Sequence, residues 1–73
     1  MPNRPRTIRW KFKELRKKAG SQRVVAKKLG TAEVTIRHIE NGHFTPSASL
    51  MAKCAVFLGS TVEELFPDIF DGL

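Results

Sequence analysis

Apolar residues recur along this chain at intervals of three and four positions, the period of an amphipathic helix. The first such stripe contains four residues: Ile8, Phe12, Leu15 and Ala19. It predicts a helix that is capped by Thr7 and ends near Lys18. The other face of this helix is basic and is expected to meet solvent: Arg9, Lys11, Lys13, Arg16 and Lys17. Trp10 lies off the stripe, and we expect it to pack against another segment, because exposing a large ring forfeits ~1.5–3 kcal/mol of burial.

The next three helices are delimited by glycines and by hydroxyl residues able to cap a helix. The second is predicted over residues 22–29 and the third over 32 to about 41. The fourth, with Ser47 or Thr45 as its cap, ends at Leu58. Gly20 is expected to stop the first helix and Ser21 to cap the second. Gly30 is expected to end the second helix and Thr31 to cap the third. The residues expected to face the core are Val25, Ala26, Leu29, Ile36, Ile39, Leu50, Met51, Cys54, Ala55 and Leu58.

A fifth helix of barely two turns is predicted after Thr61, because Thr61 and Glu64 have the spacing of a capping box. Pro67 should stop this helix, since proline lacks the amide donor that a helix interior needs. No strand signal interrupts the pattern, which therefore predicts an all-α fold of five short helices. The chain divides into three parts: a flexible basic arm at residues 1–6, the helical domain at 7–67 and an apolar tail at 68–73.

The distribution of charge adds an expectation about partners. The 73 residues carry a formal net charge of +6, and residues 1–28 hold most of the Lys and Arg with one acid, Glu14. After Lys53 the chain contains acids and no basic residue. A charge of this sign suggests an anionic partner, either nucleic acid or a membrane surface, or else a basic solubilising surface. At this length we expect one domain and no second, ligand-sensing domain.

Residue types that carry catalysis or bind metals are sparse. His38, His43 and Cys54 are too few for a zinc site, and Cys54 lies on an apolar helix face where a core position is favoured. The chain has no carboxylate pair, nucleophile elbow or phosphate-cradling glycine loop. We therefore expect no enzymatic activity, no metal and no cofactor. With no apolar leader and no run near the ~18 residues of a membrane span, we expect no membrane partner and a cytoplasmic protein, bacterial or phage-encoded.

The second and third predicted helices form the most informative unit of the chain. Ala26 is small where the two helices must cross closely, and Gly30 stands where the backbone turns. A small residue and a glycine at these places favour two helices that meet at a steep angle. The outward face of the third helix then projects from the protein, as a helix must if it is to enter the major groove.

The order and spacing of several short segments resemble the Cro/repressor-type helix-turn-helix family, also called XRE-like or lambda-repressor-like. The resemblance covers residues 13–66 and is carried by Lys13-Glu14-Leu15-Arg16, Ser21-Gln22, Val25-Ala26-Lys27-Lys28-Leu29-Gly30, Thr35-Ile36, Ile39-Glu40-Asn41-Gly42, Pro46 and Leu58-Gly59-Ser60-Thr61-Val62-Glu63-Glu64-Leu65-Phe66. It implies a compact five-helix, lambda-repressor-like DNA-binding domain. One departure is that the turn between the first two helices is a residue shorter than in the family.

The resemblance also implies roles for individual residues. Those matching positions that contact DNA phosphates are Gln22, Arg23, Thr35, Asn41 and His43. Those matching positions that read bases are Ala32, Glu33, Val34, Arg37 and His38, with Arg37 able to serve either purpose. Arg16 and Glu40 match a structural ion pair between helices one and three. An acid at position 33 has a second explanation, because it also stabilises the helix dipole by ~0.3–1 kcal/mol.

The function that this resemblance implies is sequence-specific binding of double-stranded DNA, by a repressor that acts as a homodimer on a palindromic operator. The alternative is an antitoxin or adaptor module that binds a partner protein through its C-terminal segment. The apolar residues expected to make the dimer contact are Phe66, Ile69, Phe70 and Leu73. These side chains are otherwise expected to fold back onto their own domain, against Trp10, which would leave the dimer contact to helix five or the loop at Phe44.

Overall fold

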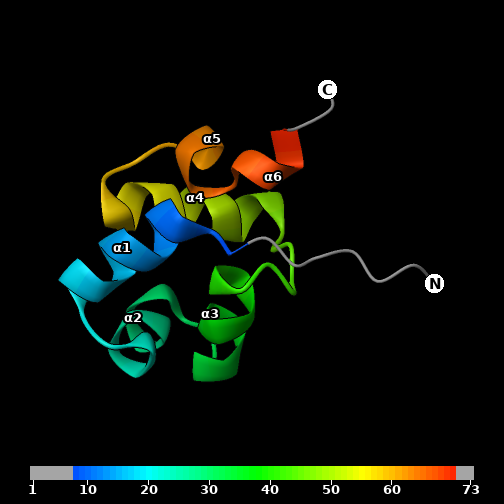
Figure 1. The fold of residues 1–73 in the computed structure, drawn as a ribbon. Coiled ribbons are helices and arrows are strands. Elements are labelled where there is room, and N and C mark those ends of the chain that lie inside the picture. Colours follow the sequence, from blue (N-terminus) through cyan, green and yellow to red (C-terminus); the bar gives the residue numbers. More distant parts are fainter. Residues whose placement is uncertain (1–7, 71–73) are drawn as a thin grey trace.

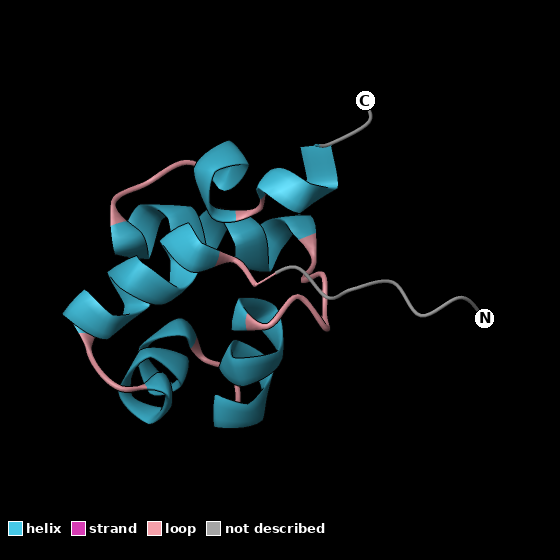
Figure 2. Ribbon diagram, in the orientation of Figure 1, coloured by secondary structure: helices cyan, strands magenta, loops and turns pink. Residues whose placement is uncertain are grey.

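The computed structural model describes residues 8–70, and all regular structure in this range is helical. The helices are α1 (Trp10–Ala19), α2 (Gln22–Leu29), α3 (Glu33–Glu40), α4 (Ala48–Leu58), α5 (Val62–Leu65) and α6 (Pro67–Phe70). In Figures 1 and 2, α2 and α3 form the lower part of the molecule, and α4 to α6 form the upper part. The all-α prediction is confirmed, and the four residues of α6 add a helix that the pattern did not predict.

Three helices begin at hydroxyl caps that the sequence predicted. The side-chain oxygens of Ser21, Ser47 and Thr61 accept hydrogen bonds from the third following amide at 3.1, 3.2 and 3.2 Å. Each bond satisfies one amide at the start of the helix that has no partner within the helix itself. Of the two candidates for the cap of α4, Ser47 is therefore the one used.

The other two predicted caps need correction. The N-cap of α3 is Ala32 and not Thr31, and it makes no side-chain hydrogen bond. Thr31 belongs to the end of α2, where its amide donates to the Ala26 carbonyl at 2.9 Å. The N-cap of α1 is Arg9, and the predicted cap Thr7 lies outside the described residues. The Arg9 amide donates to the Glu40 carbonyl at 2.8 Å, so a contact distant in sequence sets where α1 begins.

The fifth helix ends before Pro67, as predicted, but helical structure then resumes. The chain leaves α5 at Phe66, and Pro67 is the first residue of α6. Proline suits this place because the first turn of a helix needs no amide donor and the ring already holds a helical φ. Residues 68–70, expected to leave the domain as part of a tail, instead belong to this helical turn, in which Ile69 packs partly against the core.

The core is a single cluster to which α1 through α5 contribute. Its fully buried apolar side chains are Phe12, Val25, Ile36, Ile39, Cys54, Leu65 and Phe66. The rings of Phe12 and Phe66 are 5.9 Å apart between centroids, at 54° to each other. Phe66, which we expected at a dimer contact, is thus inside the monomer and has no surface to offer a partner.

Two expectations for α1 are wrong. Trp10 is 66% exposed, with the Lys13 ammonium 5.5 Å from its ring centroid, instead of packing against another segment. Arg9 and Arg16, expected on the solvent face, are only 2% and 8% exposed. The buried face of α1 is formed by Arg9, Phe12 and Arg16, whose spacing of three and four residues places them on one side of a helix.

Cys54 occupies the core position expected of it. Its side chain is fully buried, and burial raises the pKa of the thiol to about 11, which keeps it protonated at neutral pH. Within residues 8–70, no helix has the length and apolar character needed to cross a membrane.

Candidate nucleic-acid interface

α2 and α3 are joined by a tight turn that depends on Gly30. This residue has a φ of +73°, in the left-handed region, and its amide donates to the Lys27 carbonyl at 3.2 Å. A Cβ added to Gly30 would meet no atom within 4 Å, so glycine is favoured here by backbone conformation and not by lack of space. The turn places α3 along the lower edge of the molecule in Figure 1.

The shorter turn between α1 and α2 also depends on a glycine. Gly20 has a φ of +146°, and a Cβ at this position would lie 3.1 Å from Cγ1 of Val24. The Gly20 amide donates to the Arg16 carbonyl at 2.9 Å, which ends α1, and Ser21 then caps α2 directly. Glycine thus allows only two residues to separate the end of α1 at Ala19 from the start of α2.

α3 presents its two faces as the sequence pattern predicts. The five candidate base-reading residues are all exposed: Ala32, Glu33, Val34, Arg37 and His38. The opposite face is buried and consists of Ile36, Ile39 and Glu40. Val34 is 45% exposed although it is apolar, so its methyl groups are available to an apolar partner such as a thymine methyl.

Glu33 and Arg37 lie one turn apart on the exposed face and are within ion-pair distance. Arg37 Nη2 is 4.0 Å from Glu33 Oε2, and both side chains are about half exposed. A surface pair of this kind contributes only ~0.3–0.5 kcal/mol. The contact is weak enough for Glu33 to exchange it for a base, and for Arg37 to exchange it for a base or a phosphate.

The candidate phosphate-contacting residues lie at the edges of this face. Gln22 and Arg23 form the first turn of α2, Thr35 is half buried in α3, Asn41 is the C-cap of α3, and His43 follows in the loop. The rings of His38 and His43 are 5.6 Å apart between centroids, and the His43 amide donates to the His38 carbonyl at 2.8 Å. A candidate base-reading residue and a candidate phosphate-contacting residue are thereby adjacent.

The Gln22 side chain is held by a hydrogen bond to Glu40, on the buried side of α3. Its Nε2 donates to Oε2 of Glu40 at 3.1 Å, and the residue is half buried. The side chain is therefore held beside the C-terminal end of α3 at the start of α2, where backbone amides favour an anion.

Glu40 is the acceptor through which α1 holds α3. Arg16 forms a bidentate ion pair with it, Nε on Oε1 and Nη2 on Oε2, the latter at 3.2 Å. Arg16 Nη1 also donates to the Gly20 carbonyl at 3.2 Å. Glu40 is 2% exposed, so both charges are largely withdrawn from water and each depends on the other.

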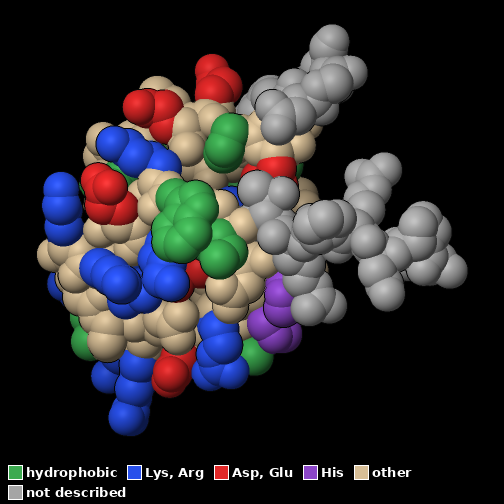
Figure 3. All heavy atoms as spheres, viewed as in Figure 1, with side chains coloured by type: hydrophobic (Ala, Val, Ile, Leu, Met, Phe, Trp, Pro, Cys, Tyr) green, Lys and Arg blue, Asp and Glu red, His purple; other side chains and the backbone are tan. Residues whose placement is uncertain are grey.

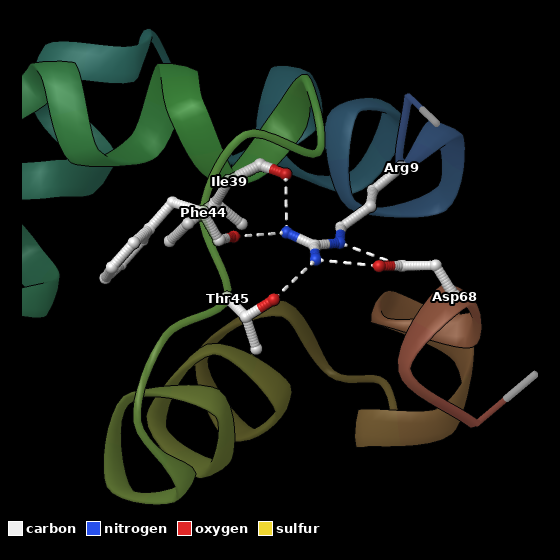
Figure 4. Close-up of polar contacts among 5 residues, drawn as sticks. All are labelled: Arg9, Ile39, Phe44, Thr45 and Asp68. Atoms are coloured by element: carbon white, nitrogen blue, oxygen red, sulfur yellow. Dashed lines mark hydrogen bonds and ion pairs between the residues drawn. The ribbon is translucent and has the colours of Figure 1, made fainter. Parts of the chain in front are cut away.

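Arg9 makes a second connection between α1 and α3, which the sequence analysis missed. Its Nη1 donates to the carbonyls of Ile39 and Phe44 at 2.9 and 2.7 Å, and its Nε and Nη2 donate to the Asp68 carboxylate at 2.9 and 2.8 Å (Figure 4). The guanidinium carbon lies 5.0 Å from the ring centroid of Phe66. The one sequence signal for its burial was its spacing of three and seven residues from Phe12 and Arg16.

The surface of this region is rich in positive charge. In Figure 3, Lys and Arg side chains lie at the left over α1 and at the lower edge formed by α2 and α3, with a few acidic side chains among them, and further acidic side chains lie at the top near α5. Among residues 8–70, no group of three or more His, Cys, Asp or Glu side chains is placed to hold a metal ion.

The residues expected at a dimer contact are only partly described. Phe66 is in the core, and Ile69 is half buried against it. The side chain of Phe70 and the whole of Leu73 lie outside the described part of the chain. Phe44, in the loop proposed as another location for the contact, is 43% exposed.

Comparison with known proteins gives consistent matches. A helix-turn-helix family model matches residues 12–65. An uncharacterised HTH-type transcriptional regulator of Methanocaldococcus jannaschii is 44% identical over 46 residues, which cover 63% of this chain and 70% of the relative. Another, of Archaeoglobus fulgidus, is 38% identical over 65 residues, covering 88% of this chain and 90% of the relative. No solved structure matches this chain significantly.

Proposed function

The chain belongs to the helix-turn-helix family of DNA-binding transcription regulators, of the XRE type, and we propose that it is a repressor that binds a palindromic operator as a homodimer. The main observation in support of sequence-specific binding is that α3 has one buried side and one exposed side. Its buried side is anchored to α1 and the core, and its exposed side consists of the candidate base-reading residues. A helix held in this way can enter a major groove without disturbing its own packing.

The exposed side chains of α3 have the chemistry needed to distinguish bases. Ala32 and Val34 would contact a thymine methyl, Glu33 would accept a hydrogen bond from a cytosine amine, and His38 would donate to guanine. Arg37 would contact either a base or a phosphate. Gln22, Arg23, Thr35, Asn41 and His43 would bind the phosphates on either side and fix the register of α3 in the groove.

A homodimer is supported by the short length of α3. Eight residues contact only a few base pairs, and two such helices spaced ~34 Å apart would match successive major grooves of a palindromic site. The chain from Ile69 onward and the loop at Phe44 are the candidate contacts. Phe66 is buried and Ile69 is half buried, so the described C-terminal residues leave little apolar surface for a second copy or for a different partner protein, and the Phe44 ring, 43% exposed, is the more accessible of these contacts.

The specificity of binding is tested by selecting duplexes from a random library and measuring anisotropy with the selected duplex and a scrambled one. At ~150 mM salt we expect the selected duplex to bind ~10³-fold more tightly or better. Equal affinities would contradict sequence-specific binding and leave only a non-specific DNA-binding protein.

The oligomeric state is tested separately by sedimentation of the full chain and of a chain lacking residues 69–73. We expect a dimer that weakens on truncation while far-UV circular dichroism stays nearly unchanged. If both chains sediment as the same dimer, the contact lies elsewhere, with the loop at Phe44 as the next candidate.

A further inference from the structure

The loop after α3 is closed by one nitrogen atom of a distant arginine. Arg9 Nη1 donates to the carbonyl of Ile39, before the turn, and to that of Phe44, after it, at 2.9 and 2.7 Å. The two carbonyls flank the candidate phosphate-contacting residues Asn41 and His43. Arg9 therefore bridges the base of the turn that carries them, as Figure 4 shows.

The position of this guanidinium is itself set from the other end of the chain. Both oxygens of the Asp68 carboxylate accept from Arg9, at 2.9 and 2.8 Å, and Asp68 belongs to α6. A two-pronged contact of this kind fixes the plane of the guanidinium as well as its place. The Arg9 side chain is 1% exposed and that of Asp68 is 28% exposed, so the carboxylate is the charge that compensates the buried arginine.

Without the Asp68 carboxylate, Arg9 would be a buried cation held by carbonyls and by one hydroxyl, Thr45 Oγ1, at 3.5 Å. Such a charge gains by moving toward water. The move would release the carbonyls of Ile39 and Phe44, and the turn that they flank would lose the bond that bridges it.

We propose that Arg9 and Asp68 are positioning residues for DNA binding: they hold the turn after α3 in the geometry in which Asn41 and His43 reach the DNA backbone. The proposal rests on the proposed function. The affinity for DNA then depends on α6, a helix near the C-terminus that is not part of the face formed by α2 and α3. Neither residue touches DNA in this scheme.

The test compares Asp68→Asn with Glu63→Gln, a matched control on α5. Both substitutions remove one negative charge, and Glu63 is exposed and lies outside the Arg9 contacts. Removing an acid strengthens binding to a polyanion, so by charge alone both variants should bind the selected duplex as well as the wild type or better. We expect Asp68→Asn to bind about tenfold more weakly, the size of typical coupling between linked sites.

Local hydrogen exchange separates positioning from general destabilisation. A smaller folded fraction lowers affinity only as far as circular dichroism shows unfolding, whereas a displaced turn lowers the affinity of a folded protein. The slope of log affinity against log salt should stay that of the wild type in both variants, since phosphate contacts of Lys and Arg set this slope and neither substitution removes one. Amide hydrogen exchange at residues 42–43, without DNA, should accelerate in Asp68→Asn only.

Arg9→Lys is the second variant, because it keeps the net charge but cannot bridge two carbonyls and two carboxylate oxygens at once. We expect it to lose affinity, and amide protection at residues 42–43, as Asp68→Asn does. Wild-type affinity and wild-type exchange at these amides in both folded variants would overturn the proposal, as would loss of folding in both, which would make the two residues purely structural. If the wild type itself binds no duplex, the proposed function fails instead.

Discussion

Replacing Glu40 by Gln tests how the reading helix is held in place. The Glu40 carboxylate is 2% exposed and accepts hydrogen bonds from Arg16 Nη2 and Gln22 Nε2 at 3.2 and 3.1 Å. An amide has nearly the same shape, so Glu40→Gln opens no cavity. It removes the charge opposite a guanidinium that is 8% exposed, and it places an NH2 donor against a donor of Arg16 or Gln22. Removing one partner of a buried ion pair costs about 3–5 kcal/mol, because the remaining charge stays desolvated.

That loss is large for so small a domain. At roughly 0.05–0.15 kcal/mol per residue, 73 residues correspond to a free energy of unfolding of about 4–11 kcal/mol. We therefore expect Glu40→Gln to lose between about a quarter and all of the wild-type free energy of unfolding at 25 °C. Combining Arg16→Met with Glu40→Leu removes both charges, and most of the lost stability should return, since apolar replacements of a buried pair are often neutral or better.

The measurement is urea unfolding followed by far-UV circular dichroism. Tryptophan fluorescence would be a poor signal, because Trp10 is already 66% exposed in the folded protein. The matched control is Glu33→Gln, which breaks the exposed pair with Arg37 and removes a charge that favours the helix dipole, and it should cost no more than about 1.5 kcal/mol in all. If Glu40→Gln and Glu33→Gln lost the same free energy, burial would add nothing to the Arg16–Glu40 pair and the reasoning would be refuted.

Three further predictions concern DNA reading, the turn before α3 and acid stability. His38→Ala should lose ~1–3 kcal/mol of discrimination at particular base pairs, whereas Gln22→Ala should weaken all sequences about equally; anisotropy over single-base operator variants measures both, and uniform losses in both would contradict the assignment. Gly30→Ala should cost ~1–2 kcal/mol in urea unfolding, and an Asn in its place less; a loss well above this range would mean that the added Cβ clashes. The Arg9 hydrogen bond holds the pKa of Asp68 below its usual 3.8. The Asp68 carboxylate therefore stabilises the fold above that pH, and this stabilisation is lost as the pH falls through the lowered pKa. In acid unfolding followed by circular dichroism, Asp68→Asn should start from a lower stability, and its stability should depend less on pH in this range.

Much of the fold follows from interactions between residues close in sequence. The stripes of α2, α3 and α4 and the caps Ser21, Ser47 and Thr61 were predictable, because a helix face repeats every three to four residues and a cap bonds an amide three residues away. The exposed and buried sides of α3 follow from the same period. The sequence by itself therefore determined which side of the helix would be available to DNA, and the all-α class of the fold.

Tertiary structure alone decided the fate of residues whose partners are distant. Arg9 is separated from Ile39 by 30 positions and from Asp68 by 59, so its spacing from Phe12 and Arg16 could place it on a buried face but could not show that carbonyls and a carboxylate would surround it. Phe66 and Trp10 were misassigned for a related reason. Burial of a large ring depends on which surface the completed fold brings to it. Phe12 and the Arg9 guanidinium lie against Phe66, whereas Trp10, with the Lys13 ammonium near its ring, stays 66% exposed.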